Sequence, residues 1–377
     1  MIRILTVVGA RPQIIKAAAI SRAISNSYSD RIREIIVHTG QHYDNNMSQV
    51  FFDELKIPSP DYNLNVGSGS HGEQTASMIL GLEKLMITQK PDFVVVYGDT
   101  NSTLAASIAA SKIHIPIVHV EAGLRSFNKS MPEELNRIIS DHSSTLLFAP
   151  TKKGFENLLA EGFQKLGAPY SIDSPGIFHC GDVMYDNSMY FSQLAMKNSH
   201  IIKNHNIVKN QFILATIHRA DNTDDSKKLE NILLALLEVI SISSLIIVLP
   251  IHPRTYKKFE NLNSKLFNTI KSNSKIVIIP PVSFFDMIEL EKNCVMVITD
   301  SGGVQKEAYF FKKPCLILRD ETEWVEIVET GSAILAGSSF SKIVNGYKLL
   351  SGNSHLYSEV FGDGKAAEFI CKIILET

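Results

Sequence analysis

Short apolar runs rich in β-branched residues alternate along the chain with longer amphipathic or alanine-rich stretches. In the first half these runs are IRILTVV (2–8), EIIVHT (34–39), FVVVYG (93–98), IVHVE (117–121) and LLFAP (146–150). In the second half they are FILATI (212–217), LIIVLP (245–250), KIVIIP (275–280), VMVIT (295–299) and PCLIL (314–318). Strands that alternate with helical stretches are typical of doubly wound parallel sheets. The pattern predicts an α/β chain with two such sheets and a cleft between two domains.

The length of 377 residues agrees with two domains, because single hydrophobic cores stop growing well below that size. A stretch rich in glycine, proline and serine (165–176) leads to HCGDVMYD and indicates a linker near residue 185. We therefore expect an N-terminal Rossmann-like domain over 1–184 and a C-terminal one over 185–362. The final helix, 363–377, is expected to pack back on the first domain.

Charge and motif content exclude several classes of protein. The formal net charge is -2 and no basic patch stands out, which argues against a nucleic-acid partner. No apolar run is long enough to span a membrane and no leader precedes the first run, so we expect a cytoplasmic, soluble protein. The four cysteines lack CxxC spacing and the histidines form no HExxH motif, so no metal is expected. A G-x-G-x-x-G fingerprint is also absent, which argues against bound NAD.

In parallel sheets ligands bind beyond the carboxyl ends of the strands, so the residues found there are candidates for a site. The first run is followed by Arg11 and Lys16, which could bind a phosphate or be ordinary surface cations. Asp99 follows the third run and could be catalytic or could cap a helix. Glu121 closes an apolar strand, where burial is costly unless the carboxylate is paired.

The stretch MPEELNR (131–137) places two acids directly after a proline. Proline and glutamate both suit the first turn of a helix, so the stretch could simply begin one. Alternatively Glu133 could join Asp99 and Glu121 as a third carboxylate on one rim of the predicted site.

The second half supplies anion-binding candidates. His218 ends a strand, where an imidazole can bind phosphate, move a proton or serve a structural role. VITDSGGVQKEA (297–308) reads as strand, small-residue turn and helix, so Ser301, Gly302 and Gly303 would let a diphosphate approach the helix N-terminus. Glu307 could accept hydrogen bonds from ribose hydroxyls. The alternative is a helix start capped by Asp300 or Ser301.

With these residues in view, the chain resembles the non-hydrolysing UDP-N-acetylglucosamine 2-epimerase family over essentially its whole length. The matching stretches are GARPQIIK, TGQHYD, YGDTNST, HVEAGLRS, MPEELNRIISD, TIHRADN, TDSGGVQKEA, RDETEW and GDGKAA. The resemblance implies the GT-B architecture with its active site in the cleft, a cytoplasmic homodimer, and a role in polysaccharide synthesis without a cofactor. The catalytic positions that it implies are Asp99, Glu121, Glu133 and His218. The implied substrate-binding positions are Arg11, Lys16, Gln41, Arg137, Ser301, Gly302, Gly303 and Glu307.

The expected reaction inverts C2 of a UDP-amino sugar. The C2 proton has no adjacent carbonyl, so elimination of UDP followed by its re-addition is the feasible route, and this route needs a base, an acid and an anion clamp. Ala220 and Trp324 stand where many family members carry cations, and GARPQ replaces Gly-Thr-Arg-Pro-Glu. These departures resemble the branch that acts on UDP-2,3-diacetamido-2,3-dideoxyglucuronate. We expect UDP-GlcNAc as substrate, with that uronate as the alternative, and with a GT-B glycosyltransferase or a nucleotide-sugar sensor as rival functions.

Overall fold

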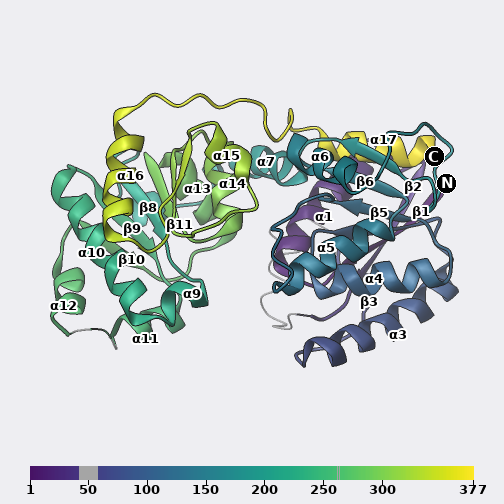
Figure 1. Ribbon diagram of the computed structural model, residues 1–377, viewed down its shortest axis with the longest axis horizontal. Helices are drawn as coiled ribbons and strands as arrows, with labels where there is room; N and C mark the ends of the chain where they lie inside the picture. The colour runs from purple at the N-terminus through teal and green to yellow at the C-terminus, as the bar shows by residue number, and fades with distance from the viewer. Residues whose placement is uncertain (42–57, 261, 263) are drawn as a thin grey trace. The chain divides into compact units, whose positions relative to one another are not determined.

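The chain folds into two compact units (Figure 1). The structure is a computed structural model that describes residues 1–41, 58–260, 262 and 264–377. Unit 1 comprises Met1–Asn187 together with Glu359–Thr377, and unit 2 comprises Ser188–Ser358. Each unit is built around its own parallel sheet, so each is described separately below.

Unit 1 contains a seven-stranded sheet in the order β3-β2-β1-β4-β5-β6-β7. Its strands are β1 (Ile2–Val8), β2 (Ile32–His38), β3 (Tyr62–Asn63), β4 (Phe93–Tyr97), β5 (Ile117–Val120), β6 (Leu146–Ala149) and β7 (Gly176–His179). All neighbouring strands are paired in parallel. Because β1, β4 and β5 are neighbours, the residues that follow them lie at the same edge of the sheet.

The helices of unit 1 cover both faces of this sheet. They are α1 (Arg11–Ala23), which continues into the short η1 (Ile24–Tyr28), α3 (His71–Gln89), α4 (Asn101–Lys112), α5 (Pro132–His142), α6 (Lys152–Ala160), the first part of α7 (Val183–Asn198) and α17 (Ala366–Glu376). In Figure 1, α3, α4 and α5 lie side by side on one side of the strands and α17 lies on the other. The apolar buried residues of α4 are all alanines, which lets the helix pack closely against its neighbours: Ala105, Ala106, Ala109 and Ala110.

The C-terminal helix α17 belongs to unit 1 although the whole of unit 2 separates it from the rest of that unit in the sequence. It packs against α1. Its first backbone N–H groups, from Ala366 and Ala367, donate to the carboxylate of Asp186 at 3.3 and 2.8 Å. Burial raises the pKa of Asp186 to about 6 although these two donors oppose the change. Phe369 completes the packing with edge contacts to Phe148 and Phe178.

Unit 2 contains a six-stranded parallel sheet in the order β10-β9-β8-β11-β12-β13. The strands are β8 (Phe212–Thr216), β9 (Ile246–Pro250), β10 (Ile276–Ile279), β11 (Met296–Thr299), β12 (Cys315–Ile317) and β13 (Ala333–Leu335). The helices are the rest of α7, α8 (Ile201–Asn204), α9 (Ala220–Thr223), α10 (Ser226–Ile242), α11 (Pro253–Glu260), α12 (Ser264–Ser272), α13 (Phe284–Asn293), α14 (Gly302–Phe310), α15 (Val325–Glu329) and α16 (Phe340–Gly352). Leucines and isoleucines of α10 form much of the core, in contact with α16.

Two parallel sheets flanked by helices confirm the predicted fold class, and each apolar run named above contains a strand. The prediction missed β3, β7 and β13, which are only two to four residues long. Residue 185, where a linker was expected, lies in α7, and the division between the compact units falls within that helix, between Asn187 and Ser188. Within the described residues, no helix is both long and apolar enough to cross a membrane.

Candidate functional site

A buried ion pair lies beyond the carboxyl ends of β1, β4 and β5. Lys16, on the second turn of α1, places its Nζ 2.5 Å from Oε1 of Glu121, and both side chains are about nine-tenths buried. The turn after β4 makes this approach possible, because a Cβ on Gly98 would lie 3.0 Å from Lys16 Nζ and 3.1 Å from Glu121 Oε1. Gly98 also has φ +62, a conformation that favours glycine. The structure thus brings two sequence-predicted residues, Lys16 and Glu121, into direct contact.

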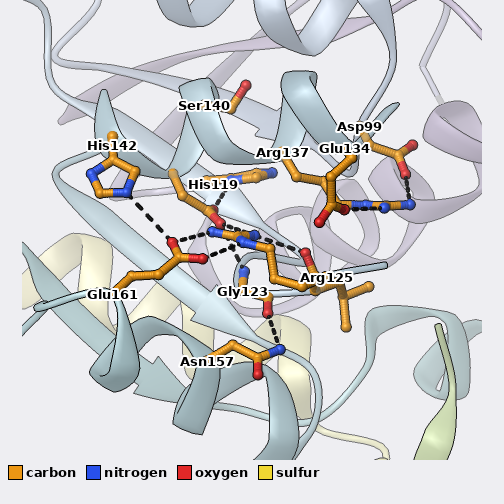
Figure 2. Close-up of polar contacts among 12 residues, drawn as sticks. Asp99, His119, Gly123, Arg125, Glu134, Arg137, Ser140, His142, Asn157 and Glu161 are labelled. Carbon is orange, nitrogen blue, oxygen red and sulfur yellow. Dashed lines mark hydrogen bonds and ion pairs between the residues drawn. The ribbon is translucent and has the colours of Figure 1, made fainter. Parts of the chain in front are cut away.

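A second pair lies at the same edge, where Asp99 follows Gly98. Arg137 of α5 donates from Nη2 to Asp99 Oδ2 at 2.5 Å and from Nη1 to Glu134 Oε2 at 2.9 Å (Figure 2). Asn136 adds a hydrogen bond to the main-chain oxygen of Asp99 at 2.9 Å. Burial raises the pKa of Asp99 despite the cations Arg137 and Lys16, and Glu121 raises it further. A carboxyl group at a strand end whose pKa is raised by burial is a candidate for proton transfer.

The two glutamates at the start of α5 have different surroundings. Glu134 is buried and accepts hydrogen bonds from the backbone N–H groups of Ser126 and Phe127 at 2.9 and 2.8 Å. Burial alone would raise the pKa of Glu134, but these N–H donors and Arg137 outweigh it and hold the pKa below its usual value. Glu133 is exposed in the first turn of the helix. Glu134 thus fixes the preceding loop, while the catalytic role expected of Glu133 stays a prediction.

A network of buried polar and charged side chains joins β5 and α5 to the turn after β4, and the sequence interpretation did not include it. His119 of β5, labelled in Figure 2, is fully buried. Its Nδ1 lies 2.7 Å from Asp141 Oδ1, and its Nε2 lies 2.8 Å from the carbonyl oxygen of Gly98. The ring therefore lies between a carboxylate of α5 and the carbonyl oxygen of the turn after β4. Burial alone would raise the pKa of Asp141, but His119 and Arg125 lower it. His119 therefore ties the Gly98 turn, and with it Asp99, to α5.

Arg125 connects this network to α6. Its Nη1 lies 2.7 Å from Asp141 Oδ2, and its Nε and Nη2 lie 2.6 and 2.7 Å from the two oxygens of Glu161. Asp141 also accepts from the backbone N–H of Gly123 at 3.1 Å, and Asn157 donates to the Gly123 carbonyl at 2.9 Å (Figure 2). The sequence contained one sign of this network, because His119 interrupts the apolar run IVHV. An imidazole buried in a strand needs hydrogen-bond partners from other parts of the fold.

Two glutamines also lie at the edge beyond the carboxyl ends of β1 and β4. Gln13 accepts from the backbone N–H groups of Gly9 and Ala10 and donates to the Tyr97 carbonyl at 3.0 Å, so it joins the end of β1 to that of β4. Gln41, predicted to bind substrate, accepts from the N–H and hydroxyl of Ser102 at 3.1 and 2.7 Å. Arg11 is exposed at the first position of α1.

In unit 2 the central group is Asp300, which follows β11 and is fully buried. It accepts from the backbone N–H groups of His218 and Arg219 at 3.1 Å, from Asn222 Nδ2 at 3.1 Å, and lies 2.9 Å from His218 Nδ1. Burial alone would raise the pKa of Asp300, but His218 and Asn222 lower it. The His218 ring is half-exposed and is oriented by Asp300, which the sequence interpretation considered only as a helix cap.

The helix cap is Ser301, whose hydroxyl accepts from the N–H of Val304 at the start of α14. A Cβ on Gly302 would come 2.6 Å from Glu323, whereas one on Gly303 would meet nothing closer than 3.9 Å. Gly303 is exposed, so the first N–H groups of the helix are approachable from solvent. Glu307 lies half-buried on the same helix.

The predicted residues thus fall into two groups. Unit 1 brings together Lys16, Asp99, Glu121 and Arg137, and unit 2 places His218 and the Ser301 turn around Asp300. The structure shows no cluster of three or more His, Cys, Asp or Glu side chains suited to a metal ion within the residues it describes.

Comparison with solved structures defines the class of protein. The chain aligns over its full length with the crystal structure of Methanocaldococcus jannaschii UDP-GlcNAc 2-epimerase in complex with UDP-GlcNAc and UDP. The TM-score is 0.86, the sequence identity is 42%, and the alignment covers 100% of both chains. The protein is therefore a GT-B-like enzyme with two Rossmann-like domains, which confirms the predicted architecture.

Comparison with known sequences defines the family. A sequence model described as UDP-N-acetylglucosamine 2-epimerase matches residues 25–375. A Methanococcus maripaludis protein named UDP-N-acetylglucosamine 2-epimerase homolog is 48% identical over 99% of both chains. A Pseudomonas aeruginosa protein named UDP-2,3-diacetamido-2,3-dideoxy-D-glucuronate 2-epimerase is 45% identical over 98% of this chain and 100% of its own. The chain belongs to the UDP-N-acetylglucosamine 2-epimerase family, as its motifs predicted.

Proposed function

We propose that this protein is a non-hydrolysing 2-epimerase that interconverts UDP-GlcNAc and UDP-ManNAc. The observation that carries the proposal is two cation-paired carboxylates at one sheet edge of a chain of this family: buried Glu121 with Lys16, and partly exposed Asp99 with Arg137. Neither pair is needed to hold an ordinary sheet together, and such pairs are typical of sites that move protons.

The proposed reaction balances without a cofactor. The C1–O bond breaks with its electron pair going to the UDP oxygen, the C2 proton passes to a carboxylate, and a C1=C2 double bond forms. In the return step a proton is delivered to C2 on the opposite face while the UDP oxygen bonds to C1 again. Asp99, whose pKa is raised by burial, is suited to hold the proton that is delivered, and Glu121 is suited to accept one.

The remaining assignments follow from the same scheme. Arg11, His218 and the turn from Ser301 to Gly303 would bind the diphosphate and stabilise departing UDP, because donors at a helix N-terminus favour anions. Glu307 would accept hydrogen bonds from the ribose, and Glu133 would join the carboxylate set. The substrate-binding set is completed by Lys16, Gln41, Arg137, Gly302 and Gly303.

Incubation with UDP-GlcNAc in deuterated water tests the proposal. We expect deuterium at C2 of both the recovered and the epimerised nucleotide sugar, because every turnover exchanges that proton. A GT-B glycosyltransferase would leave C2 unlabelled and would consume substrate only with an acceptor. A nucleotide-sugar sensor would bind UDP-GlcNAc without turnover or label, so absence of label would overturn the proposal.

A second substrate is supported by the 45% identity to the Pseudomonas aeruginosa diacetamido-glucuronate epimerase. Against it, two cations of unit 2, Arg319 and Lys306, already have partners within the described residues. Arg319 is 2.9 Å from Glu323, and Trp324 lies beneath Lys306 Nζ at 4.1 Å from the ring centre. We therefore place UDP-GlcNAc first. A kcat/KM for the uronate more than about tenfold higher, or about 1.4 kcal/mol in transition-state binding, would reverse this order.

We also propose that the enzyme works as a cytoplasmic homodimer that supplies an activated amino sugar for surface polysaccharides. Support for this comes from the family resemblance. Light scattering on the purified protein would give the mass of a dimer if the assignment is right, and the mass of a single chain if it is wrong.

A further inference from the structure

A closed ring of hydrogen bonds holds the side chain of Gln41 beyond the carboxyl ends of β1, β2 and β4. The backbone N–H of Gln41 donates to Thr39 Oγ1 at 3.3 Å, and Thr39 Oγ1 lies 2.8 Å from Ser102 Oγ. The Ser102 hydroxyl donates in turn to Gln41 Oε1 at 2.7 Å, so the hydroxyl of Thr39 is the donor to Ser102. Thr39 and Ser102 are fully buried, so water does not compete for these bonds. The ring begins and ends on Gln41 and therefore fixes the orientation of its side chain.

The backbone N–H of Ser102 determines which end of the Gln41 amide faces the ring. This N–H, in the first turn of α4, lies 3.1 Å from the same Oε1 atom. A backbone N–H can only donate, so the amide atom beside it is the oxygen and not the nitrogen. Within the described part of the chain, the Nε2 group of Gln41 makes no hydrogen bond. The amide therefore offers a ligand its two N–H donors, while its acceptor is already occupied.

Gly9 leaves the space that this ring needs. A Cβ at Gly9 would lie 2.1 Å from both Ser102 Oγ and Thr39 Oγ1. Both hydroxyls would have to move to admit a larger residue, and the ring would break. Gly9 begins the stretch GARPQIIK, which also contains Arg11 and Lys16. The ring thus packs against the turn that carries two residues assigned to the substrate.

We propose that Ser102 is a positioning residue that makes Gln41 a hydrogen-bond donor to the carbonyl oxygen of the acetamido group at C2 of the substrate. This inference rests on the proposed function, in which Gln41 belongs to the substrate-binding set. A neutral amide donor suits a neutral carbonyl oxygen, and the diphosphate has its own donors in the proposed scheme. Both candidate substrates carry an acetamido group on the carbon that is inverted. Holding that group would keep C2 in place while its proton is removed and returned.

The test uses titration calorimetry of the full chain with UDP-GlcNAc and with UDP-glucose, which carries a hydroxyl in place of the acetamido group. Ser102→Ala leaves Gln41 Oε1 with the backbone donor alone, so the preference for UDP-GlcNAc should fall about threefold to tenfold. The matched control is Ser107→Ala on the same helix, because Ser107 is also fully buried but its hydroxyl donates to the Thr103 carbonyl oxygen at 2.9 Å. This control should keep the preference. Equal affinity of the unmodified protein for both nucleotide sugars would overturn the proposal.

Gln41→Glu separates the role of Ser102 from that of Gln41. The carboxylate still accepts from Ser102 but presents an oxygen where the amide presents a donor, so the preference should fall about tenfold or more. If it falls in this variant but not in Ser102→Ala, the positioning role is refuted. If it persists in Gln41→Glu, the donor role is refuted as well.

Two further measurements keep these outcomes separate from misfolding and from failure of the proposed function. Should Ser102→Ala fail to fold, Thr39→Val decides in its place, because valine is isosteric with threonine and breaks the same ring. A preference that persists in Thr39→Val overturns the positioning role. Deuterium at C2 in the unmodified protein, together with a preference that persists in Gln41→Glu, refutes this inference alone, whereas absence of label refutes the proposed function.

Discussion

Glu133 and Glu134 are adjacent in the sequence and yet differ in nearly every physical respect. Glu134 is buried against two backbone N–H groups and Arg137, whereas Glu133 faces solvent. A carboxylate that already accepts several hydrogen bonds has little capacity left for a substrate proton. The exposed neighbour is the one that can meet a ligand, which agrees with the catalytic role proposed for Glu133.

We expect Glu133→Gln to lower kcat by about a hundredfold or more, the usual contribution of a general acid or base. Folding and UDP affinity should be nearly unchanged, because the substitution is isosteric and its site is exposed. The matched variant Glu134→Gln should instead lower the free energy of unfolding by about 1–3 kcal/mol, since buried donors lose an ionised acceptor. Turnover assays and urea unfolding measure the two effects. Normal turnover in Glu133→Gln would leave the residue with only its helix-start role.

At this scale the sequence predicted which residue types stand at strand ends, but it could not predict their partners. Lys16 and Glu121 were both singled out, yet nothing local indicated that they touch. His119, Asp141 and Asp300 were missed as functional supports because each finds its partner through the fold of the sheet edge. Gln13 looked like a departure from the family pattern, and the structure shows it joining two strand ends.

At the scale of elements, the end of α5 is attached to β5 by a cluster of polar contacts around buried Asp141. His119 and Arg125 both contact Asp141, and Arg125 also contacts Glu161 at the end of α6. Removing one member of such a cluster leaves a buried charge uncompensated, which typically costs about 3–5 kcal/mol. The cluster therefore fixes the turn that carries Asp99.

This cluster makes stability depend on pH in the acid range. The pKa of Asp141 is lower in the folded chain than its unfolded value of about 3.9, so the folded state binds fewer protons. The stabilisation from Asp141 is therefore fully present above that unfolded value and is lost as the pH falls through the folded one. Asp141→Asn should be strongly destabilised at pH 7 and should lack this part of the acid-range decline.

The single tryptophan allows the unfolding of unit 2 to be followed separately from that of the whole chain. Trp324 lies in unit 2, so its fluorescence reports unfolding of that unit, while far-ultraviolet circular dichroism reports both. Asp141→Asn should shift the circular dichroism transition and leave the tryptophan transition in place. Asp92→Asn is the control, since Asp92 is an exposed acceptor in the same unit. Equal shifts in the two variants would contradict a special role for the cluster.

Strands and helices were the most predictable level, because short runs of β-branched residues bounded by turn residues favour strands and longer amphipathic stretches favour helices. The short strands β3, β7 and β13 escaped prediction because two to four residues carry too little periodicity. The sequence did not indicate that the units divide within the helix α7, because residues 165–176, which precede it, are rich in turn-forming types.

At the scale of the whole molecule, the residues assigned to the reaction lie in two compact units. Lys16, Asp99 and Glu121 belong to unit 1, and His218 and Ser301 belong to unit 2. A site that uses both groups requires the units to approach each other around the ligand.

We expect UDP to favour a closed arrangement, because its diphosphate would contact groups of both units. Small-angle scattering should show a smaller radius of gyration with UDP, and hydrogen exchange should slow around Gly98 and Gly303. A Ser301→Glu variant, with a like charge at the helix N-terminus, should bind UDP weakly and serve as the control. Binding of UDP without either change would indicate a site that is already formed.

Because α17 belongs to unit 1, a single contiguous gene fragment cannot encode that unit without also encoding unit 2. Unit 2 is an insertion within unit 1, so the first unit is encoded by two separate segments. A fragment ending at Asn187 would lack the helix that covers α1 and would leave Asp186 and Phe148 without their α17 contacts. A premature stop codon anywhere in the last helix would likewise damage the unit that begins at the N-terminus. An independently folding version of unit 1 needs residues 359–377 rejoined to residue 187 through a short artificial connector.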